Sequence, residues 1–255
     1  MFRPLHLDPL RRTLAPLKPR KKHERNTVQN PEIEWLAGDV PLAKAFDDPY
    51  FSRENGPAET AHVFLAGNGL PGRFDLGFHI AELGFGTGLN ALMAGQAWAA
   101  FGCAGRLDYT SFEAFPLGPA ATARALCSWE FPDKAALLAG LEAGKTRIQT
   151  ASLNLRLVLG DARQTLPNEG FKADAWFLDG FSPAKNPALW APELLVHVAR
   201  CTVPHGSFAS YTAAGHVRRA LTAAGFEVSR IPGFGRKKHM ICGRLRAADE
   251  SAQSE

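Results

Sequence analysis

Residues 78–90 form the sequence feature that most restricts how this chain can fold. An apolar run at 78–81 leads directly into a glycine-rich stretch at 82–90, and the helix-forming residues 91–94 follow. A strand, a glycine-rich turn and a helix in this order open a nucleotide-type site, because backbone N–H groups at the helix N-terminus face the ligand. The segment therefore predicts an α/β fold with a nucleoside-containing ligand at this turn.

The spacing of the glycines indicates which nucleoside is bound. Glycines fall at positions 84, 86 and 88, and Leu89 stands where a dinucleotide-binding G-x-G-x-x-G segment has its third glycine. The carboxylate of Glu82 would repel a pyrophosphate, but it would attract the sulfonium and ammonium groups of S-adenosylmethionine. The E-x-G-x-G-x-G pattern resembles motif I of class I methyltransferases. Glycines that only make a tight strand-to-helix turn are the alternative interpretation.

Composition is that of an ordinary globular protein. With 255 residues, 45% hydrophobic and 21% charged, the chain is long enough for one sizeable α/β domain. Because it contains neither a long apolar run nor a secretory signal, we expect a cytoplasmic protein without a membrane span. The four cysteines lack C-x-x-C spacing and the histidines lack H-x-x-x-H spacing, so we expect no metal site and no disulfide framework.

Positive charge gathers at the ends of the chain. The net charge is +4, and residues 1–26 carry eight Lys or Arg against Asp8 and Glu24. This basic arm is either a solvated, flexible terminus or a contact for an RNA backbone. We expect a cap region at 27–77, a core at 78–246 and a flexible tail at 247–255.

From residue 78 onward, predicted strands and helices alternate, which favours a mostly parallel sheet with helices on both faces. The predicted strands are 78–83, 106–112, 153–159, 173–178, 205–211 and a final hairpin that begins at Phe226 and continues through 233–242. The resulting expectation is a Rossmann-like sheet of seven strands. The cap should contain short strands and a helix at about 56–66, and its pair Tyr50 and Phe51 either packs the cap or forms a wall of the cofactor pocket.

Three acidic residues follow predicted strands at the edge of the sheet where ligands bind in such folds. Glu113 ends strand 106–112 and can accept hydrogen bonds from both ribose hydroxyls. Asp161 either accepts from the adenine amine or caps the next helix, and these roles are compatible. Asp179 lies at the point where strand order reverses and is expected to face the chemistry, although an Asx-turn before Gly180 is the alternative.

Five segments together resemble one methyltransferase family. They are residues 46–52, 82–90, 111–117, 175–187 and 233–238. The string Asp-Gly-Phe-Ser-Pro-Ala-Lys-Asn-Pro in the fourth is far more specific than the glycine turn, because many non-glycine positions match at once. Over about residues 31–244 the chain resembles the methyltransferase of the tRNA 5-methylaminomethyl-2-thiouridine pathway, the MnmD type, also found as the N-terminal half of bifunctional MnmC.

The resemblance implies transfer of a methyl group from S-adenosylmethionine to the primary amine of 5-aminomethyl(-2-thio)uridine at the tRNA wobble position, with Asp179 beside the amine. The residues implied to bind the cofactor are Tyr50, Asn68, Glu82, Gly84, Gly86, Thr87, Gly88, Glu113 and Asp161. Those expected to contact tRNA are Phe181, Lys185, Arg236, Lys237 and Lys238, although the last three are alternatively a solvated hairpin tip.

The partners expected from the resemblance are tRNA and a separate FAD-dependent oxidase that acts upstream. No flavin domain follows residue 246, so FAD-dependent oxidation is expected to be absent. The chain is also expected to bind no metal, from its Cys and His spacing, and to act as a monomer. Two other functions stay open: a class I methyltransferase for another RNA base or a small molecule, and a non-catalytic RNA-binding module of the same fold. The intact motif residues favour a working enzyme.

Overall fold

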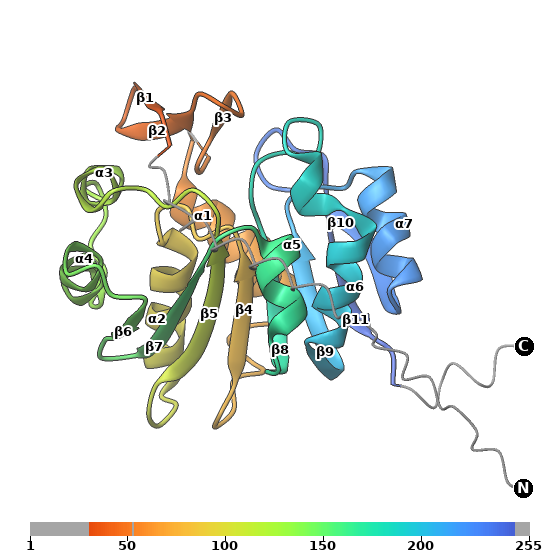
Figure 1. Ribbon diagram of the computed structural model, residues 1–255. Coiled ribbons are helices and arrows are strands. Elements are labelled where there is room, and N and C mark those ends of the chain that lie inside the picture. Colours follow the sequence, from red (N-terminus) through yellow and green to blue (C-terminus); the bar gives the residue numbers. More distant parts are fainter. Residues whose placement is uncertain (1–30, 53, 248–255) are drawn as a thin grey trace, which may run out of the picture.

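The structure is a computed structural model that describes residues 31–52 and 54–247, and its centre is one large sheet (Figure 1). The strands are β4 (His79–Leu83), β5 (Leu107–Glu113), β6 (Arg147–Gln149), β7 (Leu153–Leu159), β8 (Ala173–Leu178), β9 (Thr202–Ser210), β10 (Phe226–Pro232) and β11 (His239–Leu245). Their order across the sheet is β10-β11-β9-β8-β4-β5-β7-β6. The five central strands β9, β8, β4, β5 and β7 run parallel, whereas β6, β10 and β11 pair antiparallel. Because β4 and β8 are neighbours, strand order reverses at the predicted place.

The sheet has eight strands, so the expectation of seven was wrong by one. The seven predicted strands are all present, and β6 is an additional antiparallel edge strand beside β7. It has three residues, of which only Ile148 is buried. A segment this short cannot display the alternation by which a strand is recognised in a sequence.

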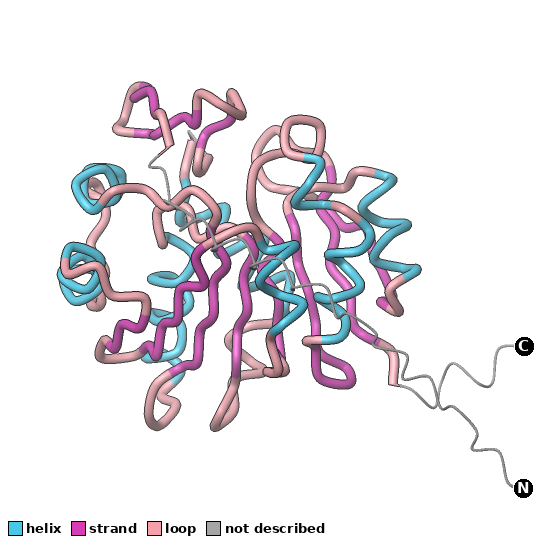
Figure 2. Tube along the Cα trace, viewed as in Figure 1, coloured by secondary structure: helices cyan, strands magenta, loops and turns pink. Residues whose placement is uncertain are grey.

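Helices cover both faces of the sheet, as the alternating pattern predicted (Figures 1 and 2). They are α1 (Gly56–Thr60), α2 (Leu89–Phe101), α3 (Pro119–Ala125), α4 (Lys134–Glu142), α5 (Ala162–Thr165), α6 (Pro192–Arg200) and α7 (Gly215–Ala223), with short turns η1 (Ala61–Leu65), η2 (Ala66–Asn68), η3 (Leu166–Asn168) and η4 (Pro187–Trp190). Buried residues of η1, α2 and α4 share one hydrophobic core, and those of α5, α6 and α7 share the other. The chain therefore has the three-layer arrangement of a doubly wound fold.

Strand β8 shows how the sequence supports these two cores. Its residues Trp176 and Phe177 are both fully buried, but they point to opposite faces. The Trp176 ring is stacked near Phe112, with centroids 6.3 Å apart, whereas Phe177 is stacked near Phe64 at 5.3 Å. A central parallel strand that is covered on both faces needs a continuous apolar run, and residues 175–178 supply one.

The cap contains a separate small sheet made of β1 (Ile33–Leu36), β2 (Val40–Ala43) and β3 (Asp48–Pro49). Figure 1 shows it above the ends of the central strands, over α1 and the loops that follow β4 and β5. The predicted helix at about 56–66 is present as the consecutive segments α1, η1 and η2. The cap thus lies at the edge of the sheet where the candidate acids were predicted.

Two properties of the described chain bear on the sequence expectations. In the range 31–247 without residue 53, no helix combines the length and hydropathy needed to cross a membrane. Within the same residues, no group of three His, Cys, Asp or Glu side chains is arranged to hold a metal ion. The basic arm 1–26 and the residues 248–255 of the predicted tail lie outside the described residues.

Candidate functional site

A cavity of about 720 Å³ opens at the carboxyl ends of β4, β5, β7 and β8. Its floor consists of the loops that follow these strands, and its rim consists of the cap and the turn between β10 and β11. This is the edge at which open α/β sheets bind their ligands. The volume is in the range typical of small-molecule and cofactor sites.

The glycine turn after β4 needs its glycines for conformation and for space. Gly84, Gly86 and Gly88 all have positive φ angles, of 87°, 54° and 77°, which residues other than glycine rarely adopt. A Cβ atom on Gly84 would lie 3.2 Å from the Cα atom of Gly180, so this turn closely approaches the loop after β8. Gly84, Gly86 and Thr87 line the cavity, whereas the space beside Gly88 is filled by the ring of Phe85.

Glu113, at the end of β5, holds the glycine turn from the next strand. Its Oε2 atom accepts a hydrogen bond from the backbone N–H of Gly86 at 2.9 Å, and Oε1 accepts from the N–H of Phe115 at 2.7 Å. Burial raises the pKa of Glu113, and these backbone donors act against the rise. Glu113 lines the cavity, and a carboxylate has about four acceptor positions, so it is a candidate acceptor for ligand hydroxyls.

Tyr50 brings the cap against the glycine turn. A Cβ atom on Gly86 would lie 3.3 Å from Cδ1 of Tyr50, which shows that ring and backbone are in contact. The Tyr50 hydroxyl is buried and has no hydrogen-bond partner among the described residues, and its pKa is raised by burial and by the charge of Glu113. An unpaired buried hydroxyl costs free energy, so this group is suited to a polar ligand in the cavity.

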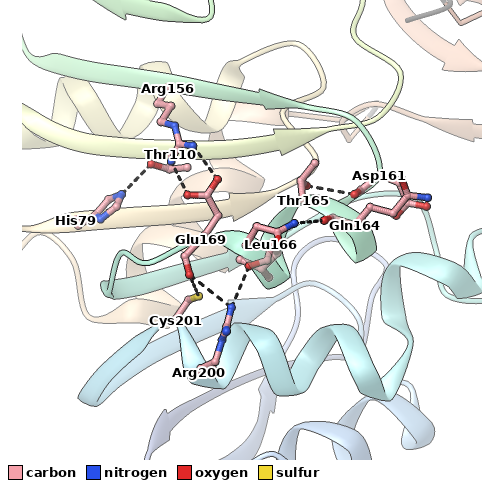
Figure 3. A network of polar contacts seen from close by, with 11 residues as sticks. His79, Thr110, Arg156, Asp161, Gln164, Thr165, Leu166, Glu169, Arg200 and Cys201 are labelled. Carbon is pink, nitrogen blue, oxygen red and sulfur yellow. Dashed lines mark hydrogen bonds and ion pairs between the residues drawn. The ribbon is translucent and has the colours of Figure 1, made fainter. Parts of the chain in front are cut away.

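Asp161 follows β7 and begins α5. Its Oδ1 atom accepts from the backbone N–H of Arg163 at 2.9 Å, so the helix-capping role is confirmed. The hydrogen bond from the Arg163 side chain lowers the pKa of Asp161. Figure 3 shows the hydrogen bond from the Thr165 hydroxyl to the backbone carbonyl of Asp161. It also shows Glu169, in the segment between β7 and β8, paired with Arg156 of β7.

Asp179 directly follows β8 and faces the cavity. Its Oδ1 atom accepts from the N–H of Gly180 and its Oδ2 atom accepts from the side-chain amide of Asn90, both at 2.8 Å. Burial raises the pKa of Asp179 to about 7. Glu59 raises this pKa further, whereas the two donors and the positive charge of Lys237 lower it. A carboxyl with this pKa exchanges protons near neutral pH.

Behind Asp179 lies a second acid, Glu82, which has no solvent exposure and does not line the cavity. Its Oε1 atom accepts from Asn90 at 2.8 Å, and its Oε2 atom accepts from the hydroxyl of Ser111 at 2.7 Å. Burial raises the pKa of Glu82 to about 8. Glu82, Asn90 and Asp179 together form a connected group that we call the carboxylate cluster.

Aromatic side chains cover one side of the cavity entrance. The ring of Phe181 is stacked on Phe46 at 4.6 Å and meets Tyr50 edge-on at 5.2 Å. Phe115 also lines the cavity and is about half exposed. Flat apolar surfaces next to hydrogen-bonding groups suit the binding of nucleobases.

Ion pairs connect the rim to the rest of the protein. Lys185 pairs with Asp47 of the cap at 2.9 Å. In the turn between β10 and β11, Arg236 pairs with Glu54 at 3.3 Å, and Lys237 pairs with Glu59 at 2.9 Å. The Lys237 ammonium also lies 3.9 Å from the centre of the Tyr211 ring, so it takes part in a cation–π contact.

Comparison with known proteins identifies the family. Residues 131–246 match the model of a family described as S-adenosyl-L-methionine-dependent methyltransferase. Over 237 residues the chain is 46% identical to the tRNA 5-methylaminomethyl-2-thiouridine biosynthesis bifunctional protein MnmC of Chromohalobacter salexigens, covering 85% of this chain and 33% of that protein. The protein of the same name from Pseudomonas aeruginosa PAO1 is 44% identical, with 88% and 36% covered. Residues 131–246 of this chain belong to the S-adenosyl-L-methionine-dependent methyltransferase family. The chain spans about a third of the length of these two relatives.

A solved structure supports the same assignment. The crystal structure of MNMC2 from Aquifex aeolicus superposes with a TM-score of 0.69 at 27% identity, covering 87% of this chain and 72% of that one. The class I, Rossmann-like fold expected from the sequence is therefore confirmed, apart from the strand count.

The cavity of this methyltransferase collects most of the residues that the sequence predicted for the site. Those that line it are Tyr50, Gly84, Gly86, Thr87, Glu113, Asp161, Asp179, Phe181, Arg236 and Lys237. Glu82, Gly88, Asn68, Lys185 and Lys238 do not line it. Glu82 is bonded to Asn90, which lines the cavity, and Gly88 belongs to the glycine turn that forms part of its wall.

Asn68 lies in a different environment from the rest of the predicted site. Its side-chain amide donates to the carbonyls of Phe64 at 2.9 Å and Trp176 at 3.3 Å, and its Oδ1 atom accepts from the hydroxyl of Ser207 at 2.6 Å. Only 2% of Asn68 is exposed. These contacts tie η2 to β8 and β9, so in this structure the side chain supports the sheet.

Sequence reasoning did not assign roles to three side chains that the structure brings to the floor of the cavity. Asn90 bridges two carboxylates, Thr60 donates to Asn90 at 2.7 Å, and Tyr211 donates to the carbonyl of Gly180 at 2.8 Å. Asn90 was part of the matched segment 82–90, and its polarity inside an apolar helix start was the available signal. Thr60 and Tyr211 offered no comparable signal.

Proposed function

We propose that this methyltransferase transfers a methyl group from S-adenosylmethionine to the primary amine of 5-aminomethyl(-2-thio)uridine at the wobble position of tRNA. The observation that carries the proposal is the Asp179 carboxyl group, which faces the cavity next to the glycine turn with a pKa of about 7. The names of the relatives, which concern biosynthesis of tRNA 5-methylaminomethyl-2-thiouridine, support the choice of substrate.

The cavity is suited to the cofactor in shape and in its polar groups. The glycine turn leaves backbone open to the cavity, and Glu113 offers acceptors for ribose hydroxyls. The unpaired hydroxyl of Tyr50 supplies a further polar contact beside Glu113. S-adenosylmethionine supplies the electrophilic methyl group. We propose that Gly84, Gly86, Thr87, Glu113 and Asp161 contact it.

Asp179 prepares the substrate amine for attack. An ammonium group has no lone pair, so it must first lose a proton, and Asp179 is the acceptor within the cavity. The neutral nitrogen then forms its bond to the methyl carbon as the carbon–sulfur bond breaks, with the bonding electrons going to sulfur. Hydrogen bonding to Asp179 keeps the nitrogen in line with that bond.

The rim is proposed to hold the tRNA. Phe181 and Phe46 provide apolar surface for a base, and Arg236, Lys237 and Lys238 provide positive charge for phosphates. Lys185 is bonded to Asp47, so we propose that it first positions the cap and contacts tRNA only from there. The basic arm 1–26, which lies outside the described residues, is proposed as a further phosphate contact.

The decisive experiment is methylation of defined tRNA. Purified protein is incubated with S-adenosylmethionine and with tRNA that carries either 5-aminomethyl-2-thiouridine or an unmodified wobble uridine, and digested nucleosides are measured by mass spectrometry. We expect one added methyl group on the first substrate only. Methylation of another nucleoside would replace the proposed substrate, and no methylation of any RNA would contradict the function.

Two further measurements complete the proposal. Wobble nucleosides from a deletion strain should lack the methylated form and accumulate the free amine, the product of a proposed separate FAD-dependent oxidase upstream. The purified protein should be colourless and should bind S-adenosylmethionine in a calorimeter. A yellow protein with stoichiometric FAD would contradict the expected cofactor.

A further inference from the structure

We propose that Asn90 is a positioning residue of this methyltransferase: held by Thr60, its side-chain amide orients the carboxylate of Asp179 and joins it to the buried carboxylate of Glu82. The inference rests on the proposed function for its effect on turnover, but its structural content concerns the carboxylate cluster alone. Because Glu82 does not line the cavity, its contact with Asp179 is made through the side chain of Asn90.

The amide of Asn90 donates both of its N–H groups to acidic side chains. Nδ2 lies 2.8 Å from Oε1 of Glu82 and 2.8 Å from Oδ2 of Asp179. These two acids come from the ends of the adjacent strands β4 and β8, and Asn90 reaches them from the first turn of α2. An amide has two donor hydrogens, so no donor of this side chain remains for a third group.

Thr60 holds the oxygen end of the Asn90 amide. Its hydroxyl donates to Oδ1 of Asn90 at 2.7 Å from the end of α1, and both side chains are buried. If the amide were turned over, its oxygen would face the two carboxyl groups and neither would receive an N–H donor, whereas the Thr60 hydroxyl can either donate or accept. The two acids therefore set the orientation of the amide, and the hydrogen bond from Thr60 holds it in place.

The groups around Asp179 show why this donor matters. Glu82 lies behind the amide, Glu59 of α1 adds negative charge, and Lys237 of the turn between β10 and β11 adds positive charge. The Tyr211 hydroxyl, which follows β9, is bonded to the Gly180 carbonyl and donates nothing to Asp179. Besides the backbone N–H of Gly180, Asn90 is the only hydrogen-bond donor to Asp179 among the side chains that the structure describes.

Removal of this donor should make Asp179 harder to ionise. A hydrogen bond to the charged form of an acid lowers its pKa, and loss of such a bond raises it. Asn90→Leu keeps the approximate size of the side chain and removes both N–H groups. We expect the titration midpoint of Asp179 to rise by about one pH unit or more.

The titration can be measured without any tRNA. Protein labelled with carboxyl-¹³C aspartate is titrated by NMR, and the signal of Asp179 is identified by its absence from Asp179→Asn. The expected result is an upward shift of this midpoint in Asn90→Leu relative to wild type. An unchanged or lowered midpoint would overturn the inference.

A milder pair of variants keeps the test valid if Asn90→Leu does not fold. Thr60→Val removes only the hydroxyl that holds the amide in place, and we expect a smaller upward shift of the same midpoint. Thr110→Val is the matched control, because Thr110 is also a buried threonine in a side-chain hydrogen bond, with His79 at 3.0 Å. Equal shifts in both valine variants would overturn the inference.

Kinetics then separate this inference from the proposed function. In the wild type, turnover on aminomethyluridine tRNA should rise with pH as Asp179 ionises, and in Asn90→Leu this rise should move to higher pH while affinity for S-adenosylmethionine is kept. Failure of the wild type to methylate would count against the proposed function alone. A methylating wild type whose pH profile is the same in both Asn90→Leu and Thr60→Val would count against the inference alone.

Discussion

The floor and the rim of the cavity both consist of polar side chains, but they are stabilised in opposite ways. In the floor, the amide of Asn90 is bonded to Asp179 and to Glu82, which is fully buried behind the cavity wall. In the rim, Arg236 forms an ion pair near solvent with 95% of its side chain exposed, whereas Lys237 also contacts the Tyr211 ring. The floor is therefore a connected buried network, whereas the rim is a set of separate surface contacts.

This difference explains why the two regions suit different tasks. Burial shifts the pKa values of the floor carboxyls toward neutrality, which suits proton transfer, and buried groups are poorly screened by salt. Exposed ion pairs contribute little to stability, so phosphates can replace the rim carboxylates at small cost. We expect chemistry to depend on the floor and tRNA binding to depend on the rim.

The largest effect should follow from Asp179→Asn. The variant keeps the size of the side chain and one acceptor but loses the base, so turnover should fall by ~100-fold or more while affinity for S-adenosylmethionine is kept. Raising the pH should partly restore turnover, because more of the substrate amine is then already neutral. Wild-type turnover at neutral pH would remove Asp179 from the mechanism, and loss of cofactor binding would make it a cofactor-site or structural residue.

Glu113→Ala tests whether the floor also binds the cofactor. Loss of charge-assisted hydrogen bonds worth ~1.5–3 kcal/mol should weaken affinity for S-adenosylmethionine about tenfold or more, as measured by calorimetry. Glu142→Ala, on the exposed surface of α4, is the control and should keep the affinity. If both variants bind the cofactor equally well, Glu113 only supports the glycine turn.

For the rim, we expect neutralisation of Arg236, Lys237 and Lys238 to raise the Michaelis constant for tRNA without changing cofactor affinity. The dependence of tRNA binding on salt should flatten by about one unit of slope for each lost phosphate contact. Deletion of residues 1–26 should act in the same direction. An unchanged slope in both variants would show that these charges are ordinary solvated surface.

The stability of the folded protein should depend on pH through the protonation of Glu82. Because its pKa is raised from 4.5 to about 8, the folded protein holds a proton that the unfolded chain releases over this range, and stability therefore falls as pH rises from 4.5 to 8. In Glu82→Gln this fall should be shallower, as measured by thermal unfolding at several pH values. A parallel fall in both proteins would show that Glu82 does not contribute to it.

The smallest effect should come from Lys185→Ala. This residue pairs with Asp47, whose side chain is 83% exposed, so its removal should lower the free energy of unfolding by less than about 1 kcal/mol. Chemical denaturation in low and high salt measures the change, which should be smaller in high salt. A large loss that salt does not alter would place Lys185 with the buried network and weaken the contrast between floor and rim.

The positions of the floor acids were predictable from the sequence because they depend on local rules. The glycine turn at 84–88 and the acids at 113, 161 and 179 each stand within two residues of the end of a predicted strand. Parallel strands end at the same edge of a sheet, so residues just after them converge without any knowledge of side-chain contacts. For the same reason, the layers and the reversal of strand order between β4 and β8 were predicted correctly.

Side-chain partners were decided only by the tertiary structure. Asn90 and Asp179 are 89 positions apart, and Lys185 and Asp47 are 138 apart, so no local pattern indicates that either pair is in contact. Asn68 matched the cofactor-site prediction by its segment, yet packing of η2 on β8 and β9 directs its amide to backbone carbonyls. Periodicity and strand order determine where a residue emerges, whereas the distances between packed elements determine which group it meets.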